Sequence, residues 1–374
     1  MEATRRREYA RRAVLSAFVV LFAATACSAP AQPERSCSPA RPDVGSVEGW
    51  VGYLGAHPGD VALVADDGRG RIVERRAHEV QPMASAGKVL NLVAYAMAVA
   101  EGTVSPGDPV RVGDWERWAV LGGGEQAHAD ALDDLGVPRN GMRARDPGQV
   151  VTLGQVVSRM IVRSDNAAPD YLRDLLGDDA LTRAAGAVGW ADPELPSTTG
   201  LTVSFFTPEL LPRQGGRAAR RAAEWEIARR YAYDSAFRAD VDSRQVPKGA
   251  DEPAFVEGGP GGTARQLASL WSAIAHGTFP GAAIARGIVE RVPEPEPGLL
   301  AIGAKGGNAP GVLARGTEIR RDDGTVAVAV VLVRSMSAED TGRVNRSSVA
   351  FNDFLTAIAR DPSILPAPRC LPAR

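Results

Sequence analysis

The sequence predicts an α+β protein, an α/β/α sandwich built from an antiparallel sheet with flanking helices and a mostly helical lobe. Strand-length apolar runs lie near both ends of the chain, and helical periodicities fill the middle. The turn Asp322-Asp323-Gly324 lies just before a long apolar run, 326–333, and such a turn favours an antiparallel hairpin.

The first predicted elements are a helix over 46–56 and a hairpin whose strands are 61–64 and 71–75. A second helix begins near Ser85 and stops at Gly102. Its apolar positions recur at three- and four-residue steps: Val89, Leu90, Val93 and Met97.

Two further helices flank residues 164–166, because apolar residues recur at helical spacing over 153–161 and again from Pro169 onward. The last elements are strands over 302–305, 318–321 and 326–333, and a closing helix over 344–360. The first and last helices would then pack on the same sheet.

Residues 1–26 are typical of an export signal. Several arginines precede an apolar run, 13–26, that is too short to span a bilayer as a stable helix. Ala24-Thr25-Ala26-Cys27 resembles a bacterial lipobox, so we expect lipid on Cys27 and attachment to the outer face of the cytoplasmic membrane. A plainly secreted protein is the alternative, and both Sec and Tat export stay open.

Residues 27–44 contain the anchor site and a linker rich in proline, serine and alanine, and 45–374 form one domain. If Cys27 carries lipid, Cys37 and Cys370 remain as an even pair in an oxidising compartment. We therefore expect a disulfide between Cys37 and Cys370, with two unrelated free thiols as the alternative.

Charge and histidine placement exclude several functions. The net charge of -2 gives no indication of nucleic-acid binding. His57, His78, His128 and His276 lack the spacing of metal ligands, so they support neither a metal site nor a Ser-His-Asp triad. We expect a monomer with no metal and no cofactor.

Lysine is rare in this chain, and two of its three lysines lie in short motifs. Ser85-Ala86-Gly87-Lys88 is an S-x-x-K motif at a helix start, where helical spacing places Lys88 one turn from Ser85. Lysine, unlike arginine, becomes a neutral base in suitable surroundings. Lys88 is therefore a candidate acceptor for the proton of the Ser85 hydroxyl, although an isolated S-x-x-K is common.

Two more motifs follow in order. Ser164-Asp165-Asn166 lies in the predicted loop between helices, where an ordinary turn is the alternative because all three residue types favour turns. The third motif, Lys305-Gly306-Gly307, lies at the strand predicted over 302–305.

With S-x-x-K, S-D-N and K-G-G in this order, the sequence resembles the class A β-lactamases and their actinobacterial relatives. The resemblance spans about residues 46–361, and it places the chain in the superfamily of serine β-lactamases and penicillin-binding proteins. It implies a five-stranded antiparallel sheet. It also implies that Ser85 is the acylated nucleophile, with its backbone N–H as half of an oxyanion hole, and that Lys88 accepts its proton.

The same resemblance assigns roles to the other two motifs. Ser164 would relay a proton to the leaving nitrogen, and Asn166 would bind the substrate amide. Lys305, with Gly306 and Gly307, would bind the substrate carboxylate. As a second cation, Lys305 would also lower the proton affinity of Lys88.

Two departures from the family pattern concern deacylation and carboxylate binding. Asp192 stands where the pattern W-E-P-E-L-N has the glutamate that activates water, and Glu194 follows two residues later. A carboxylate displaced by about 1 Å can cost on the order of a hundredfold in rate. Either Asp192 or Glu194 would activate the deacylating water, or neither would. The alternative is that both are exposed carboxylates of an ordinary turn. K-G-G also lacks the hydroxyl of K-T-G, for which Asn308 is a candidate replacement.

Residues 208–260 form an arginine-rich helical insertion. A lid near the site is one interpretation, and a helix packed on the helical lobe is the one we prefer.

The leading function is an exported serine hydrolase that acts through an acyl-enzyme on a β-lactam or a related cyclic or peptide amide, with impaired deacylation. Its partner would be a small β-lactam or a peptidoglycan-derived molecule. A penicillin-binding enzyme resembling a DD-peptidase and a non-catalytic cell-envelope protein of the same fold are the alternatives. The sequence does not identify the natural substrate.

Overall fold

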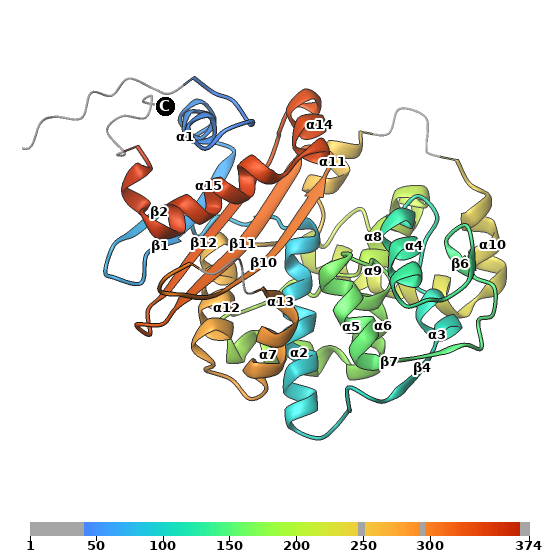
Figure 1. Ribbon diagram of the computed structural model, residues 1–374. Helices are drawn as coiled ribbons and strands as arrows, with labels where there is room; N and C mark the ends of the chain where they lie inside the picture. The colour runs from blue at the N-terminus through green and yellow to red at the C-terminus, as the bar shows by residue number, and fades with distance from the viewer. Residues whose placement is uncertain (1–40, 246–250, 292–295, 367–374) are drawn as a thin grey trace, which may run out of the picture. The chain divides into compact units, whose positions relative to one another are not determined.

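The computed structural model describes residues 41–245, 251–291 and 296–366 (Figure 1). The export signal, Cys27, Cys37 and Cys370 lie outside these ranges, so the lipid anchor and the disulfide stay predictions. Among the helices of the described ranges, none combines the length and the apolar character that a membrane span requires.

A six-stranded antiparallel sheet forms the centre of one lobe, in the order β2-β1-β12-β11-β10-β9. The strands are β1 (Val61–Asp66), β2 (Ile72–Arg75), β9 (Glu290–Arg291), β10 (Leu299–Ala309), β11 (Val312–Arg321) and β12 (Val326–Val333). The expected count of five missed β9, a two-residue strand that pairs only with Ile302 and Gly303. Strand β12 is buried along its whole length between β1 and β11, which explains its uninterrupted apolar sequence.

The first and last helices pack on one face of the sheet, as predicted (Figure 1). Helix α1 (Val47–Ala56) and helix α15 (Val349–Arg360) meet where the rings of Trp50 and Phe351 lie 4.7 Å apart. The closing helix predicted over 344–360 is in fact two helices, because Ser347 adopts extended backbone (φ -155°, ψ 115°) and ends α14 (Ala338–Arg346).

Helices α12 (Ala264–His276) and α2 (Lys88–Ala100) belong to the core on the other face of the sheet. In Figure 1, α2 passes between the sheet and the helical lobe. Every residue from Lys88 to Ala96 is buried, so this helix is covered on all sides over more than two turns. A helix in this position carries its first residues, including Lys88, to the junction of the two lobes.

The helical lobe is built around the predicted helices α5 (Leu153–Val162) and α6 (Ala168–Leu176). The remaining elements complete this lobe or connect it to the sheet: α3 (Val112–Glu116), α4 (Glu125–Asp134), α7 (Asp178–Ala187), α8 (Thr198–Phe206), α9 (Gly216–Tyr233), α10 (Ser235–Ser243), α11 (Glu252–Glu257), α13 (Ala282–Val289) and the paired short strands β3 (Gln81–Pro82) with β8 (Gly261–Gly262), β4 (Pro109–Arg111) with β7 (Val150–Thr152), and β5 (Arg139–Asn140) with β6 (Arg143–Ala144).

The arginine-rich insertion packs on the helical lobe through α9. The Trp225 ring stacks on Trp118 with the centroids 5.5 Å apart, and the Arg173 guanidinium lies 4.2 Å from the Trp225 ring. Arg221 donates to the fully buried carboxylate of Glu224 at 2.8 Å. These contacts fit the packed-helix interpretation rather than a free-standing lid.

Candidate active site

Ser85 lies in a short 3-10 turn, Ala84–Gly87, directly before α2. Ala84 has a φ of 43°, a left-handed conformation that is strained for a residue with a Cβ. The turn is fixed from one side by Met83, whose N–H donates to the carbonyl of Pro260 at 3.4 Å. A strained residue held by its surroundings next to the candidate nucleophile is a feature of functional sites.

The strand that carries K-G-G lies directly against this turn. A Cβ built on Gly307 would meet the backbone nitrogens of Ser85 at 2.4 Å and of Ala86 at 2.6 Å. Only glycine allows β10 to approach the start of the helix so closely. The motif is therefore part of the wall around Ser85, as its place in the sequence pattern implied.

Lys88 is the first residue of α2, and its amine is turned toward the S-D-N loop. Nζ donates to the Ser164 carbonyl and to Oδ1 of Asn166, both at 2.5 Å, and lies 3.3 Å from Ser164 Oγ. The hydrogen bond to Ser85 that helical spacing suggested is not formed, because the loop offers three acceptors. Catalytic hydrogen bonds are often completed only in the substrate complex.

Burial governs the charge of Lys88. Its side chain is 4 % exposed, and burial lowers the pKa of Lys88 to about 7, although the carboxylates of Asp165 and Asp170 raise it. At neutral pH a large fraction of this amine is therefore unprotonated, which is the form that accepts a proton.

Ser164 stands between two lysines. Lys305 Nζ donates to Ser164 Oγ at 2.9 Å, the same hydroxyl that Lys88 Nζ reaches at 3.3 Å, and to the Gly306 carbonyl at 2.9 Å. Burial lowers the pKa of Lys305 well below its ordinary value, and the charges of Lys88 and Arg315 lower it further. The two lysine motifs thus converge on the hydroxyl of the S-D-N motif.

The amide of Asn166 is bonded on both sides. Oδ1 accepts from Lys88, and Nδ2 donates to the Gly123 carbonyl at 2.7 Å. The neighbouring Gly124 has a φ of 90°, and a Cβ there would meet Asn166 Nδ2 at 2.5 Å. The glycine run before α4 is thus shaped to fit the Asn166 side chain.

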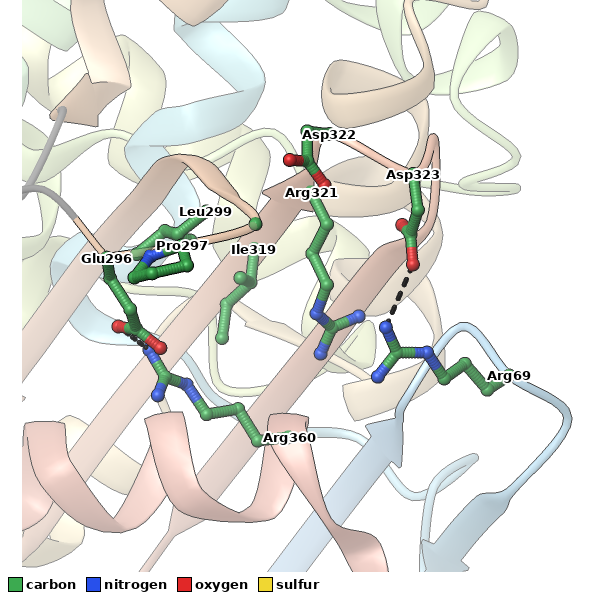
Figure 2. Close-up of a pocket in the computed structure, with 10 residues that line it drawn as sticks. Arg69, Glu296, Pro297, Leu299, Ile319, Arg321, Asp322, Asp323 and Arg360 are labelled. Carbon is green, nitrogen blue, oxygen red and sulfur yellow. Dashed lines mark hydrogen bonds and ion pairs between the residues drawn. The ribbon is translucent and has the colours of Figure 1, made fainter.

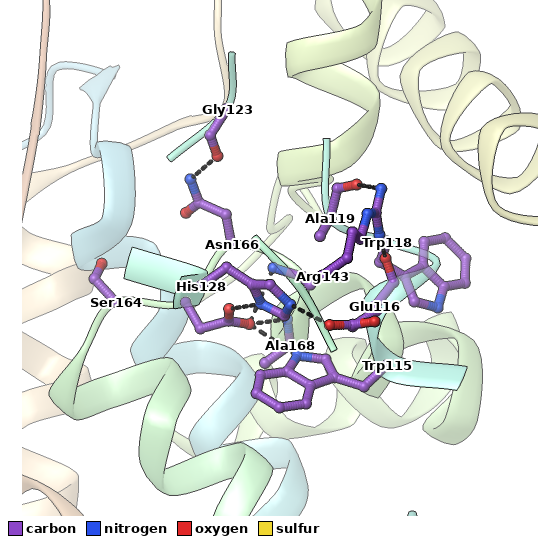
Figure 3. Close-up of polar contacts among 12 residues, drawn as sticks. Trp115, Glu116, Trp118, Ala119, Gly123, His128, Arg143, Ser164, Asn166 and Ala168 are labelled. Atoms are coloured by element: carbon purple, nitrogen blue, oxygen red, sulfur yellow. Dashed lines mark hydrogen bonds and ion pairs between the residues drawn. The ribbon is translucent and has the colours of Figure 1, made fainter. Parts of the chain in front are cut away.

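Asp165 is part of a buried polar cluster that sequence reasoning missed (Figure 3). Its Oδ2 lies 2.5 Å from Nδ1 of His128, and its Oδ1 accepts from the indole N–H of Trp115 at 2.9 Å. His128 and Asp165 are 37 residues apart, so no local spacing signals the pair. This contact pairs His128 with a carboxylate, so it does not conflict with the absence of metal-ligand spacing among the four histidines.

Arg315 is a second residue that the sequence interpretation missed. It pairs with Gly306 across the β10–β11 hairpin, and a Cβ on Gly306 would lie 3.2 Å from its Nη1. The guanidinium thus takes the space that a larger side chain at position 306 would need. The sequence could have indicated this pairing, because a two-residue hairpin loop at Pro310-Gly311 places position 306 opposite position 315.

A pocket of about 190 Å³ lies beside Gly306 and Arg315, between β10, β11 and the last helices. Asn308 also lines it, but its amide donates to Oδ1 of Asn345 at 2.6 Å. Asn308, the expected replacement donor, is therefore already bonded, whereas the Arg315 guanidinium lies beside the space that a side chain at position 306 would fill.

Neither candidate carboxylate for deacylation is free and buried at Ser85. Asp192 is exposed, with a φ of 48°. Glu194 forms a two-pronged ion pair with Arg217, one contact at 2.8 Å, and accepts from the Gly261 N–H at 3.0 Å. Burial raises the pKa of Glu194, but the bonds from Arg217 and Gly261 outweigh burial and lower it.

A larger pocket, of about 350 Å³, lies at the opposite end of the β10–β11 hairpin (Figure 2). Its charged side chains pair among themselves, with Arg69 donating to Asp323 at 2.9 Å and Arg360 to Glu296 at 2.7 Å. It contains none of the motif residues, so the site is defined by the meeting of the three motifs and not by pocket size.

The chain belongs to the Beta-lactamase enzyme family, whose sequence profile matches residues 51–283, more than half of the 374 residues. The resemblance inferred from the motifs is thereby confirmed. No functionally curated protein is a significant match to the chain.

The fold is supported by a solved structure. A β-lactamase from Sphaerobacter thermophilus DSM 20745 is 19% identical, with a TM-score of 0.52, over 87% of this chain and 100% of that one. Weaker likenesses include PBP-A (17% identity, TM-score 0.47, 84% and 93% covered) and a β-lactamase from Chitinophaga pinensis DSM 2588 (14%, 0.49, 85% and 99%). At these identities the likeness concerns the fold, which is the predicted α+β sandwich.

Proposed function

We propose that the protein is an exported serine hydrolase that opens a β-lactam or a related cyclic or peptide amide through an acyl-enzyme on Ser85 and releases the acyl group slowly. One observation carries the proposal: the buried amines of Lys88 and Lys305 both reach Ser164 Oγ, at 3.3 and 2.9 Å, beside the turn that holds Ser85. Such a convergence of titratable groups around a serine suits nucleophilic acyl transfer.

The acylation step follows from this geometry. Neutral Lys88 takes the hydroxyl proton as Ser85 Oγ bonds to the substrate carbonyl carbon. The amide C–N bond then breaks, and the nitrogen receives a proton through Ser164, to which both lysines are hydrogen-bonded. The helix start beside Ser85 favours the negative charge that develops on the carbonyl oxygen. Water later cleaves the ester and frees the acid.

The charge of the site favours an anionic substrate. The half-buried guanidinium of Arg315 lies close enough to Lys305 for its charge to lower the pKa of Lys305, and the Lys305 amine donates to a hydroxyl and a backbone carbonyl. A substrate carboxylate would relieve their repulsion and form charge-assisted hydrogen bonds. β-Lactams and the carboxyl-terminal ends of peptides both carry such a group.

The engagement of Glu194 by Arg217 and the exposure of Asp192 favour a second candidate function, a penicillin-binding enzyme with a long-lived acyl-enzyme. Both candidates share the acylation chemistry of Ser85. They differ only in how fast water reaches the ester.

Export remains part of the proposal, with lipid on Cys27 and a Cys37–Cys370 disulfide. Val44 and Leu365, near the two ends of the described chain, belong to one core cluster, which supports a link between the termini. Peptide mapping of the mature protein without reductant should recover the linked cysteine peptides, and free thiols at both positions would reject the disulfide.

Two assays test the function. A fluorescent penicillin should label the wild-type protein covalently and leave Ser85→Ala unlabelled, while Ser243→Ala, an exposed serine of α10, should be labelled normally. Turnover of a chromogenic cephalosporin then separates a hydrolase from a penicillin-binding enzyme. Absence of labelling in the wild type with a panel of β-lactams would reject both functions.

A further inference from the structure

His128, which is labelled in Figure 3, forms a buried pair with Asp165, the middle residue of the S-D-N motif. Their side chains are 2 % and 0 % exposed, and Nδ1 of His128 lies 2.5 Å from Oδ2 of Asp165. A buried aspartate without a partner would be strongly destabilising, so the contact to His128 is energetically important. The pair is contributed by α4 and by the loop that contains Ser164 and Asn166.

The charged groups around His128 favour the imidazolium form. Besides Asp165, Glu116 of α3 faces the ring, with its Oε1 3.6 Å from His128 Nε2, an ion-pair distance. Arg143 lies nearby, but it donates to the backbone carbonyls of Glu116 and Ala119. Burial lowers the pKa of His128, and Asp165 with Glu116 outweighs it and raises the pKa to about 9.

Asp165 transmits this contact to the catalytic loop. Its Oδ1 accepts from the backbone N–H groups of Ala167 and Ala168, at 3.1 and 2.7 Å, where α6 begins. Ser164, directly before it, is held at a φ of 62°. Fixing the Asp165 carboxylate thus fixes the backbone of the residues that bind Lys88.

The first turn of α4 holds Asn166 as well. The backbone N–H of His128 donates to the Gly124 carbonyl at 3.3 Å, and the adjacent Gly123 carbonyl accepts from Asn166 Nδ2 at 2.7 Å. The start of α4 therefore contacts Asp165 through the His128 ring, and the chain just before it contacts Asn166 through the Gly123 carbonyl.

We propose that His128 is a positioning residue of the Ser85 site: its ion pair with Asp165 fixes Ser164 and Asn166 and weakens the field of Asp165 at the Lys88 amine. The catalytic part of this proposal rests on the function proposed above. The electrostatic part, the effect of the ion pair on the Lys88 amine, does not depend on that function. Lys88 is faced by Asp165 and Asp170, which favour its charged form, and its own charge lowers the pKa of the neighbouring Lys305.

The sign of the effect follows from these charges. Replacing His128 by neutral glutamine leaves the Asp165 charge uncompensated, so the Lys88 ammonium becomes more favourable and its pKa rises. Replacing Asp165 by asparagine removes the negative charge and lowers the Lys88 pKa. The double variant loses both charges and should return close to the wild-type value.

The chain is suited to a direct measurement, because it has only three lysines, Lys88, Lys248 and Lys305. In protein labelled with 13C at lysine Cε, three NMR signals are expected, and single Lys→Arg variants assign them. His128→Gln should raise the Lys88 pKa by about half a pH unit or more, and Asp165→Asn should lower it. His276→Gln, an exposed histidine of α12, is the matched control and should leave it unchanged.

An unchanged Lys88 pKa in folded His128→Gln would overturn the proposal. If that variant does not fold, the wild-type protein decides the question, because the His128 ring itself is observable among four histidines. It should remain protonated up to pH 8, and titration near the ordinary value of 6.5 would overturn the ion pair.

The catalytic consequence is tested separately by the rate of labelling with a fluorescent penicillin as a function of pH. The acidic limb should move to higher pH in His128→Gln, together with the Lys88 pKa. A limb that stays in place while the Lys88 pKa moves would overturn the catalytic role of His128. If the wild-type protein is never labelled, the proposed function is rejected. The ion pair between His128 and Asp165 is then tested by the NMR titration alone.

Discussion

Gly307 of β10 lies against the backbone of Ser85 so closely that a Cβ at position 307 would fall 2.4 Å from the Ser85 nitrogen. The obstructing atoms belong to the main chain at the start of a buried helix, which cannot turn aside as a flexible side chain does. The sheet and the helix that carries Lys88 are thereby fixed relative to each other at Ser85.

Gly307→Ala should therefore impair acylation selectively. The methyl group pushes β10 away from Ser85, and a displacement of about 1 Å in such a site lowers the rate on the order of a hundredfold. Stopped-flow labelling with a fluorescent penicillin measures the rate. Gly186→Ala is the matched control, because that helical glycine of α7 has open space around it and should gain about 0.5–1 kcal/mol of stability without loss of activity.

Arg315 should determine the affinity for anionic substrates. Arg315→Gln removes a half-buried cation beside Lys305 and should raise KM for a penicillin by roughly tenfold or more, which corresponds to one lost charge-assisted hydrogen bond. A methyl ester of the same penicillin should be affected far less. Arg229→Gln on the exposed side of α9 controls for the change in net charge, and an equal effect on acid and ester would contradict the assignment.

Acylation should depend on pH through Lys88. Burial lowers the pKa of Lys88 to about 7, so the amine is mostly protonated and inactive as a base below that pH and mostly neutral above it. The acylation rate should rise through neutral pH and level off on the alkaline side. A rate that is constant down to pH 5, measured with a substrate that does not titrate in that range, would contradict the role of Lys88.

The sequence predicted the elements whose signals are local. The apolar stripes of α5 and α6, the first helix predicted over 46–56 and the hairpin of β1 and β2 all depend on spacing within a few residues. The three motifs also fell in the predicted elements. Their convergence on Ser164 was expected only through the family resemblance, because no local pattern places Lys305 beside it.

The features that the sequence did not reveal depend on tertiary contacts. Strand β9 is two residues long and has no periodicity to detect, and the break at Ser347 interrupts a continuous apolar stripe. The contact of His128 with Asp165 forms only because α4 packs behind the S-D-N loop. Sequence spacing therefore located the candidate reacting groups but not the residues that hold them in place.

Deacylation should be the slow step. Acylation needs the groups that the structure brings together around Ser85, whereas Asp192 is exposed and Glu194 is bonded to Arg217 and Gly261. A good acylating substrate should therefore give a burst of product followed by slow turnover. Quenched-flow measurement of product together with intact-mass detection of the adduct separates the two phases.

Three variants identify the carboxylate that acts on water. If Asp192 positions the water, Asp192→Asn should slow the second phase and spare the burst. If Glu194 acts only by holding the loop against α9, Glu194→Gln and Arg217→Gln should have similar effects, because each breaks the same ion pair. If Glu194 is itself the base, Glu194→Gln should slow the second phase far more than Arg217→Gln, since the latter keeps the carboxylate. A second phase unchanged by all three substitutions would mean that neither carboxylate activates the water, and the acyl-enzyme would then persist as it does in a penicillin-binding protein rather than turn over as in a β-lactamase.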